Sequence, residues 1–540
     1  MNACIKKIII SLVFILIIGM NFISATSKIV QKEKQTNASI FDDDIDWWPM
    51  FHHDLNRSGY STSTGPETNN VLWAFHVEDG AVSSPAIVDN KVYFGDDSKN
   101  LYCLDSDTGQ EIWNRTVPYN IWGSSPAVDN GKVYFAGDSF DAYIDCLNAT
   151  DGEIIWSYKI PGNNFLQSSP VVYDGKVFIG APEPEPGCMY CLDADSGEEI
   201  WISQTIDNPG SPSVYSNRVF FGAGDFNVYC LDADNGTVIW KYKTGGEYSP
   251  YIQIHVAIYD DKLYAGGRDG LYCLDIEDGG LIWKYPTIDK IDTTPCTAYG
   301  FVYFAPVDDK IYCLDADTGE KIWEYDIPLY VSSSPTVADG KLYIGTGDSH
   351  SYEFHDLESG KIYCLDAITG EKIWEYDTTS RVYCTPAIAD GKIYIGTNDF
   401  YTSSDEMYCI GGESDNSPPY TPKEILGSKY YKPGPYKNIY NTSTYDPDGD
   451  QLYYKWWWGE DGTDWLGPFN SNETVEINIR FYYDYPHTIK VIVQDSYHAR
   501  SDWARLEVRV SRDKTIISSF LSHLFERYPL LERFLTLFLN

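Results

Sequence analysis

Residues Lys310–Asp326 read K-I-Y-C-L-D-A-D-T-G-E-K-I-W-E-Y-D, and much of the chain consists of variants of this stretch. The variants share a Tyr-Cys-Leu-Asp-like run, an acidic turn with Gly, and the pair Ile-Trp. The closing tryptophans are Trp113, Trp156, Trp201, Trp240, Trp283, Trp323 and Trp374. Because successive tryptophans are 39 to 51 residues apart, the sequence predicts a repeat architecture.

Each repeat predicts four short antiparallel strands. In the repeat that closes at Trp374 these are Ser333–Val337, Lys341–Gly345, Ile362–Asp366 and Lys372–Asp377. Short β-branched and aromatic runs separated by Asp-Gly and Thr-Gly turns are hairpin signals. No segment of the repeats has the apolar spacing of a helix, which excludes the helical solenoids. Four strands per repeat are typical of a β-propeller blade.

The number of blades is predicted from the third strand, where a cysteine recurs. These cysteines are Cys103, Cys146, Cys191, Cys230, Cys273, Cys313, Cys364 and Cys409. We expect them to be buried apolar residues rather than disulfide partners. The last repeat stops after Ile410, and an unassigned strand, Val71–Phe75, lies near the N-terminus. The sequence thus predicts an all-β fold with an eight-bladed propeller that the N-terminal strand closes.

The composition limits the classes of partner. The 540 residues include 79 acidic and 40 basic side chains, a formal net charge of −39. Nucleic-acid binding requires a basic surface and is therefore excluded, as is docking on anionic lipid headgroups by charge. At the N-terminus, Lys6-Lys7 precede the apolar run Ile8–Met20, which predicts a cleaved signal peptide and an extracellular or cell-surface protein.

The remaining segments give the expected domain boundaries. Apolar residues recur at helical spacing after residue 515, which predicts an amphipathic tail that contacts a membrane surface or a partner. The expected boundaries are 1–25 for the signal peptide, 26–46 for a disordered lead-in, 47–412 for the propeller, 413–422 for a linker, 423–510 for a β-sandwich and 511–540 for a helical tail.

The repeats resemble the pyrroloquinoline-quinone-type, or BamB-like, propeller family through their Leu-Asp-Ala-x-Thr-Gly-x-x-x-Trp segments. The opening Trp47–Asp54, with Arg57-Ser58-Gly59, is similar to the start of such domains. The resemblance implies that the tryptophans pack between blades and that their indole N–H groups find carbonyl acceptors. The family includes quinoprotein dehydrogenases, which hold Ca²⁺ with a Glu, Asn and Asp set beside the quinone, and non-catalytic scaffolds.

The sequence contains no Cys-Cys pair, and an Asn and two carboxylates do not map onto one motif that matches the family's. We therefore predict no enzyme and no quinone cofactor, but an exported scaffold that presents a binding face to an extracellular protein or glycan. Two alternatives stay open: a quinoprotein dehydrogenase and a carbohydrate-binding adhesin.

The binding face is predicted where the loops after the second and fourth strands meet. The former carry acidic residues and the latter carry aromatic ones. In the fifth repeat, His255 stands where the other repeats place a proline-led strand. The candidate ligand-binding residues are Trp122, Asp138, Asp225, His255, Asp269, Asp308, Tyr330 and Tyr383.

The segment after residue 418 has another pattern. Asp446-Pro447-Asp448-Gly449-Asp450 precedes Leu452–Trp458, and a later strand, His487–Val493, leads to Asp495. This order resembles the PKD-type immunoglobulin-like domain, which implies a spacer or adhesion unit. Since carboxylate oxygens are ligands that Ca²⁺ prefers, Asp446, Asp448 and Asp450 are the candidate metal ligands.

Overall fold

The computed structural model describes residues 45–510, except 78–79, 81–82, 122, 138–141, 162–167, 183–186, 205–207, 246–253, 328–330, 332, 348–359, 399–404, 413–418, 432, 459–460, 464, 483–485, 496–500 and 502. The predicted signal peptide and helical tail lie outside these residues. The described residues form two compact units, one up to residue 412 and one from residue 419 onward. They contain only strands, turns and loops, and none of their segments is a helix long and apolar enough to cross a membrane.

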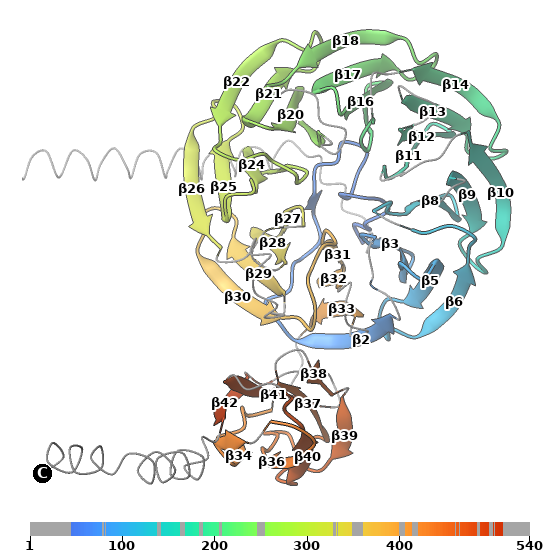
Figure 1. Cartoon of the computed structure of the whole chain (residues 1–540). Coiled ribbons are helices and arrows are strands. Elements are labelled where there is room, and N and C mark those ends of the chain that lie inside the picture. The colour runs from blue at the N-terminus through green and yellow to red at the C-terminus, as the bar shows by residue number, and fades with distance from the viewer. Residues whose placement is uncertain are drawn as a thin grey trace, which may run out of the picture. The chain divides into compact units, whose positions relative to one another are not determined.

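Four-stranded antiparallel sheets, one of which has a fifth, parallel strand added at its inner edge, radiate around an axis in the first unit and are here called blades (Figure 1). The innermost strands are β3 (Ala86–Val88), β7 (Ala127–Asp129), β11 (Val171–Tyr173), β15 (Ser213–Tyr215), β19 (Val256–Tyr259), β23 (Cys296–Ala298), β27 (Thr336–Ala338) and β31 (Ala387–Ala389). The second strands are β4 (Lys91–Gly95), β8 (Lys132–Gly137), β12 (Lys176–Ala181), β16 (Arg218–Gly222), β20 (Lys262–Gly267), β24 (Phe301–Phe304), β28 (Lys341–Thr346) and β32 (Lys392–Gly396). Blades 1 to 8 are numbered in this order.

The third and outer strands carry the repeated motif. The third strands are β5 (Asn100–Asp105), β9 (Ala142–Asn148), β13 (Cys188–Asp193), β17 (Asn227–Asp232), β21 (Gly270–Asp275), β25 (Lys310–Asp315), β29 (Lys361–Asp366) and β33 (Asp405–Gly411). The outer strands are β6 (Glu111–Thr116), β10 (Ile154–Ile160), β14 (Glu199–Gln204), β18 (Val238–Lys243), β22 (Leu281–Pro286), β26 (Lys321–Asp326), β30 (Lys372–Asp377) and, in blade 8, β2 (Val71–Val77). Since β2 pairs with β33, one blade unites the two ends of the unit.

The turn between the third and outer strands explains the repeated Asp, Thr and Gly. In blade 6, Asp315 Oδ1 accepts hydrogen bonds from the backbone N–H of Thr318 at 2.9 Å and from its hydroxyl at 3.0 Å. Gly319 has a φ of +71°, and a Cβ there would lie 2.7 Å from the Trp283 ring of blade 5. Only glycine therefore suits both the backbone conformation and the interblade contact.

The same tryptophans link neighbouring blades through hydrogen bonds, as the resemblance implied. Trp283 Nε1 donates to the Ala316 carbonyl at 3.2 Å, and Trp323 Nε1 donates to the Ala367 carbonyl at 3.1 Å. Trp374 differs, because its buried Nε1 has no acceptor among the described residues. In the short last repeat the equivalent carbonyl is that of Gly412, which accepts a hydrogen bond from the Thr68 hydroxyl at 3.2 Å instead.

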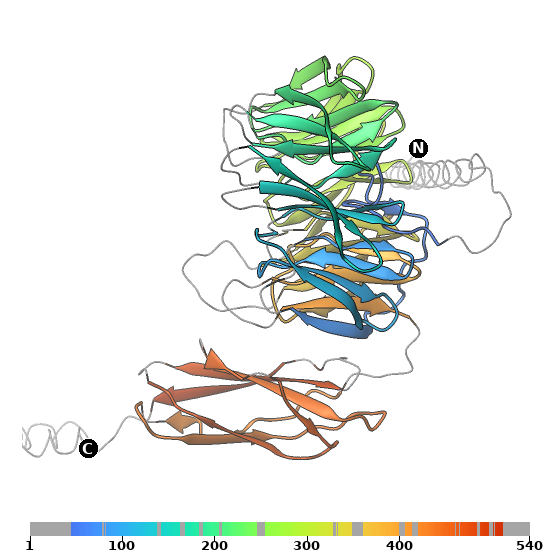
Figure 2. The ribbon, with the colours of Figure 1, turned by 90° about the vertical axis from the view of Figure 1, so that its right-hand side faces the viewer.

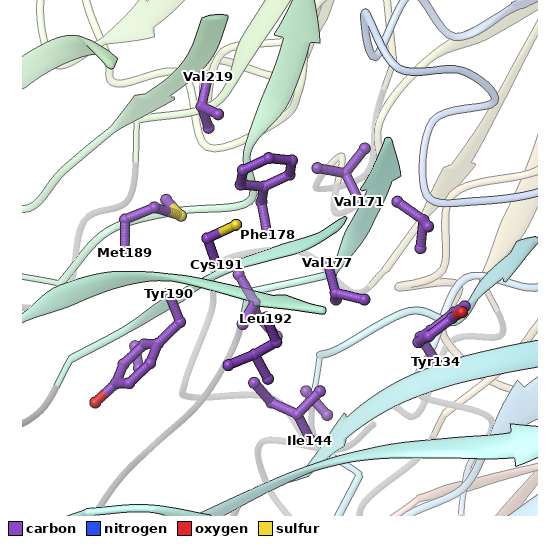
Figure 3. Close-up of a cluster of buried hydrophobic side chains, with 14 of the residues drawn as sticks. Tyr134, Ile144, Val171, Val177, Phe178, Met189, Tyr190, Cys191, Leu192 and Val219 are labelled. Atoms are coloured by element: carbon purple, nitrogen blue, oxygen red, sulfur yellow. The ribbon is translucent and has the colours of Figure 1, made fainter. Parts of the chain in front are cut away.

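Apolar side chains fill the spaces between blades. In Figure 3, Phe178 and Cys191 of blade 3 belong to one buried cluster that also contains Tyr134 of blade 2 and Val219 of blade 4. The described cysteines are all buried thiols, including the eight of the third strands, which confirms the structural role predicted for them.

The axial segment, residues 47–61, crosses the centre of the blades (Figures 1 and 2). Its backbone carbonyls accept hydrogen bonds from inner strands: Pro49 from Val128 at 2.7 Å, and Asn56 from Ile258 at 2.9 Å. The segment ends in β1 (Tyr60–Ser61), which pairs in parallel with β27. The opening motif that resembles the family is therefore an axial brace of the fold.

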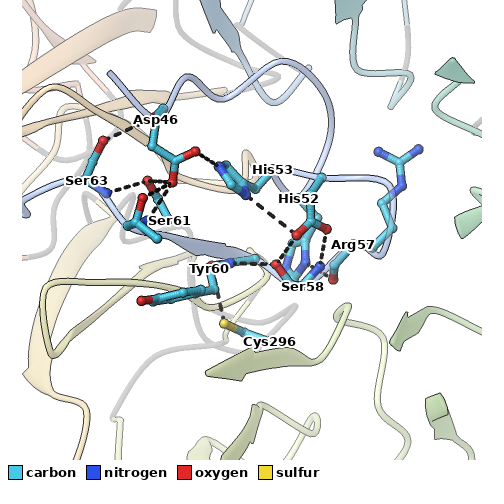
Figure 4. A network of polar contacts seen from close by, with 12 residues as sticks. Asp46, His52, His53, Arg57, Ser58, Tyr60, Ser61, Ser63 and Cys296 are labelled. Atoms are coloured by element: carbon cyan, nitrogen blue, oxygen red, sulfur yellow. Dashed lines mark hydrogen bonds and ion pairs between the residues drawn. The ribbon is translucent and has the colours of Figure 1, made fainter. Parts of the chain in front are cut away.

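Arg57 fixes this brace to blades 3 and 4. Its fully buried guanidinium donates to the carbonyls of Pro212 at 3.0 Å and Pro170 at 3.1 Å, and also to that of Phe51. Nearby, His53 lies between Asp46 and Asp54, with its Nε2 atom 3.2 Å from Asp46 Oδ1 (Figure 4). Burial alone would lower the pKa of His53, but the two carboxylates raise it to about 9.

The second unit is a pair of sheets around its own core. One sheet is β34 (Leu426–Gly427), β36 (Asn438–Thr442) and β40 (Val475–Ile479). The other is β35 (Tyr430–Tyr431), β42 (Ala504–Val510), β41 (His487–Asp495), β37 (Leu452–Trp458) and β38 (Asp461–Gly462), with β39 (Leu466–Phe469) also paired to β37. Alternate residues such as Tyr454 and Trp456 face the shared core and are buried there. Their rings therefore offer little surface to a ligand.

Candidate functional site

A layer of hydroxyl-bearing residues joins the inner ends of the blades. Each lies three residues before the central residue of an inner strand, and most accept a backbone N–H from the preceding blade. The Ser125 hydroxyl accepts from Ser84 N at 3.0 Å, and the Ser84 hydroxyl accepts from Thr385 N at 2.9 Å. This hydroxyl ring consists of Ser84, Ser125, Ser169, Ser211, Thr294, Ser334 and Thr385, and His255 occupies the equivalent position in blade 5.

His255 interrupts the hydroxyl ring in blade 5. Ile258, three residues later, donates to the axial segment as Val214 does in blade 4, so His255 is equivalent to Ser211. The corresponding residue of blade 6 is Thr294, whose buried hydroxyl has no hydrogen-bond partner among the described residues. Burial lowers the pKa of His255, while the charge of Asp292 acts in the opposite direction. The imidazole is therefore neutral near pH 7 and can accept a proton.

Charged and aromatic residues precede the ring residues of blades 6 and 8, Thr294 and Thr385. Asp292 and Tyr383 each lie two residues before the ring residue of their blade, and Lys290 and Arg381 each lie four residues before it. Lys290 forms an ion pair with Asp292 at 2.5 Å. Arg381 Nη1 donates to the Tyr383 hydroxyl at 3.4 Å. Lys290 and Arg381 thus place two basic side chains close in sequence to the hydroxyl ring, in a chain whose formal net charge is −39.

An amide and a carboxylate meet between blades 8 and 1. Asn398 is 2% exposed, and its Nδ2 atom donates to Asp97 Oδ2 at 3.3 Å. Its backbone N–H donates to the Arg381 carbonyl at 2.8 Å, which ties the loop after β32 to the loop before β31. Amide and carboxylate oxygens are the donors that a hard metal ion requires.

Three of the predicted acidic residues instead hold their own loops. Asp225 Oδ2 accepts from the Tyr229 hydroxyl at 2.7 Å, and Asp308 Oδ2 accepts from the Tyr312 hydroxyl at 2.8 Å. Asp269 accepts from the Tyr272 hydroxyl at 2.6 Å and pairs with Lys284. A tyrosine of the third strand thus caps each loop, which accounts for the acid that recurs there. Of the other candidates, Trp122, Asp138 and Tyr330 lie outside the described residues.

The candidate metal ligands of the second unit are only partly together. Asp446 and Asp450 lie close to each other and to Asp495, with one ligand atom from each carboxylate within 4.8 Å of the others. Asp448 is exposed and is not part of this cluster. Sequence reasoning missed Asp495 because it lies 45 residues after Asp450, at the end of a neighbouring strand. It also missed the hydroxyl ring, whose signal was the Ser or Thr that precedes the Pro before every inner strand except that of blade 5.

The described architecture is that of a pyrroloquinoline-quinone-type β-propeller. The chain belongs to the family whose profile is described as outer membrane protein assembly factor BamB, which matches residues 58–182, 140–294, 289–361 and 354–407. That description is compatible with the predicted export.

Solved structures share this fold. A europium-containing methanol dehydrogenase superposes with a TM-score of 0.56 at 15% identity, over 68% of this chain and 98% of that one. BamB from Moraxella catarrhalis gives a TM-score of 0.52 at 15% identity, over 63% of this chain and 99% of that one.

Curated relatives match shorter stretches. The quinoprotein alcohol dehydrogenase PedH of Pseudomonas putida is 25% identical over 25% of this chain and 26% of its own length. The quinohemoprotein alcohol dehydrogenase of Comamonas testosteroni is 23% identical over 32% of this chain and 22% of its own length. A tetrathionate hydrolase of Acidithiobacillus ferrooxidans is 23% identical over 28% of this chain and 34% of its own length. The chain thus spans between about a fifth and a third of the length of these relatives.

These relatives correct two predictions made from the sequence. The prediction of a non-catalytic scaffold, and with it the statement that the protein is no enzyme, is wrong, because the relatives include several quinone-dependent dehydrogenases. The same relatives conflict with the prediction that no quinone binds. That prediction relied on finding the amide and the carboxylates within one continuous motif. In the folded chain an amide and a carboxylate can meet from distant positions, as Asn398 and Asp97 do across 301 residues.

Proposed function

We propose that the propeller is the catalytic domain of a quinone-dependent oxidoreductase that acts on an alcohol. The observation that carries the proposal is the interruption of the hydroxyl ring, where His255 replaces a hydroxyl and the side-chain hydroxyl of the next ring residue, Thr294, has no partner among the described residues. The quinoprotein alcohol dehydrogenases among the relatives support the reaction class.

We also infer that the propeller has eight blades, with β2 as the closing strand, that the second unit is an immunoglobulin-like spacer, and that the chain is exported.

The donor set suits an acidic quinone and a hard cation. Arg381 and Lys290 would face the carboxylates of the quinone. Asn398 and Asp97 would supply oxygen ligands to the cation. The sequence has no Cys-Cys pair to stack beside the ring, so the hydroxyl ring and Tyr383 would serve as the surface against which the quinone lies. When bound, the quinone supplies the acceptor for the two electrons that leave the alcohol.

His255 then has the part of a general base. Its imidazole is neutral because burial lowers its pKa, and it would accept the hydroxyl proton of the alcohol. The Thr294 hydroxyl would hold the substrate oxygen in place. Asp292 would stabilise the imidazolium that results, since its charge favours the protonated form.

The test uses the purified chain with pyrroloquinoline quinone at a constant Ca²⁺ concentration. We expect the quinone to bind in equilibrium dialysis and a dye-linked assay to show oxidation of primary alcohols. His255→Ser, which restores the residue type of the repeat, should retain the quinone and lose oxidation by roughly 100-fold or more. The matched control His76→Ser changes an exposed histidine of β2 and should leave both unchanged. Absence of both quinone binding and dye reduction in the unaltered chain would overturn the proposal.

A further inference from the structure

The second unit contains a compact acidic cluster that the chemistry of the propeller does not use. Asp446 and Asp450 flank the turn before β37, and Asp495 is the last residue of β41. One ligand atom from each of the three carboxylates lies within 4.8 Å of the others. Asp446 is 4% exposed and Asp495 is fully buried. Three carboxylates this close repel one another, most strongly where they are buried, and a cation bound between them would relieve that repulsion.

The two oxygens of Asp446 have different environments. Oδ1 accepts backbone hydrogen bonds from Asp448 at 2.9 Å and from Asp450 at 3.2 Å, which shapes the turn. Oδ2 is buried and has no hydrogen-bond partner among the described residues. A buried carboxylate oxygen without a partner is rare in native proteins and indicates a missing ion or water. Here it belongs to a carboxylate that lies beside two others.

We propose that the second unit binds one Ca²⁺ ion through the carboxylates of Asp446, Asp450 and Asp495. The donors are oxygen atoms, which favours a hard cation over zinc or copper. Asp446 Oδ2 and the carboxylates of Asp450 and Asp495, which can bind in a bidentate manner, together with water reach the six to eight oxygens that Ca²⁺ takes. Mg²⁺ is less suited, because it requires near-ideal octahedral geometry and retains its own water.

The ion would join two parts of one sheet. Leu452, near the start of β37, pairs directly with Asp495 at the end of β41. Ca²⁺ therefore links the turn at 446–450 to the neighbouring strand, at a place where Gly449 adopts a φ of +86° and lets the chain fold back. Binding to the folded state alone raises the stability of this unit by mass action.

The test is calorimetry on the full chain after treatment with a chelator. Titration with Ca²⁺ alone up to about 1 mM should show one site per chain, in the range of extracellular Ca²⁺ modules. The same ion should raise the midpoint of one thermal transition. Asp495→Asn and Asp450→Asn should each weaken binding at least about tenfold. The matched control Asp448→Asn removes an exposed carboxylate from the same turn and should bind as the unaltered chain does.

Two results would overturn the proposal. One is the absence of both binding heat and a thermal shift in the unaltered chain. The other is a loss in Asp448→Asn equal to that in Asp495→Asn, which would show that the proposed three carboxylates are not the specific ligands. Terbium luminescence, excited through the tryptophans of β37, reports binding separately from stability. Each variant is first compared with the unaltered chain by circular dichroism, so that a failure to fold is not scored as a failure to bind.

Discussion

His53 is a buried cation in the axial segment, and its charge depends on two partners. Its Nε2 atom lies 3.2 Å from Asp46 and its Nδ1 atom lies 3.8 Å from Asp54, and the Ser58 hydroxyl donates to Asp54 at 2.6 Å. Despite burial, these hydrogen bonds and ion pairs lower the pKa of Asp46 and of Asp54. The neighbouring His52 is the opposite case, because burial lowers its pKa to about 4. Of these adjacent histidines, His53 is therefore cationic and His52 neutral at neutral pH.

The raised pKa of His53 predicts a stability that falls as the pH rises. The pKa of a histidine is about 6.5 in the unfolded chain, whereas the pKa of His53 in the folded chain is about 9. The folded state therefore binds more protons between these values, and the stabilisation is complete below about 6.5 and lost above about 9. We expect the unfolding midpoint of the propeller to decline across this window and then to level off.

His53→Gln should lower the midpoint at pH 7 and remove most of the decline. His76→Gln is the control, because His76 is exposed and should leave the profile of the unaltered chain in place. Thermal unfolding followed by circular dichroism from pH 6 to pH 10 measures both. A decline of the same size in His53→Gln would show that the Asp46, His53 and Asp54 cluster is not its source.

At the scale of the blade, the contact between a tryptophan and the next turn recurs with one exception. Trp323 and Trp374 are 8% and 9% exposed and contact Tyr303 and Tyr343 at nearly equal distances. The indole N–H of Trp323 donates to the Ala367 carbonyl, whereas that of Trp374 has no acceptor in the part of the chain that the structure describes. Trp323→Phe therefore loses a hydrogen bond and leaves a buried carbonyl unsatisfied, whereas Trp374→Phe removes a donor without a described partner.

We expect Trp323→Phe to reduce the free energy of unfolding by about 1 kcal/mol more than Trp374→Phe. Both changes remove a similar apolar area, so the difference isolates the hydrogen bond. Chemical denaturation of the two variants, monitored by circular dichroism, gives the comparison. Equal losses would mean that the interblade hydrogen bond contributes nothing beyond packing.

The blade motif was predictable because its causes are local. The turn Asp315–Gly319 follows from an Asp that bonds its own backbone and a Gly that adopts positive φ, and both are visible as neighbours in sequence. The pair Asn398 and Asp97 was not predictable, since only the ring arrangement brings these residues together. Asp495 was missed for the same reason, because its pairing across from Leu452 depends on strand register. The axial segment was recognised as a motif, but its hydrogen bonds to the inner strands required the fold.

At the scale of the whole molecule, the two units have separate cores. The second unit has its own cluster around Trp456 and Val491, and the interblade clusters such as that around Phe178 contain residues of the propeller. The two ends of the propeller meet within the first unit, because β2 is paired with β33. The strand that completes the sheet of β31, β32 and β33 thus comes from the same unit.

A chain that ends at residue 412 should therefore fold as the propeller alone. Because the axial segment, β2 and the eight inner strands are all retained, we expect its unfolding midpoint to match the propeller transition of the full chain within about 2 °C. Its midpoint should not respond to Ca²⁺ when the quinone is absent, whereas the full chain should show a second transition that Ca²⁺ raises. Scanning calorimetry of both chains, with Ca²⁺ and with a chelator, measures all four cases. A midpoint lowered by more than about 5 °C in the shorter chain would show that the propeller depends on the second unit for its stability.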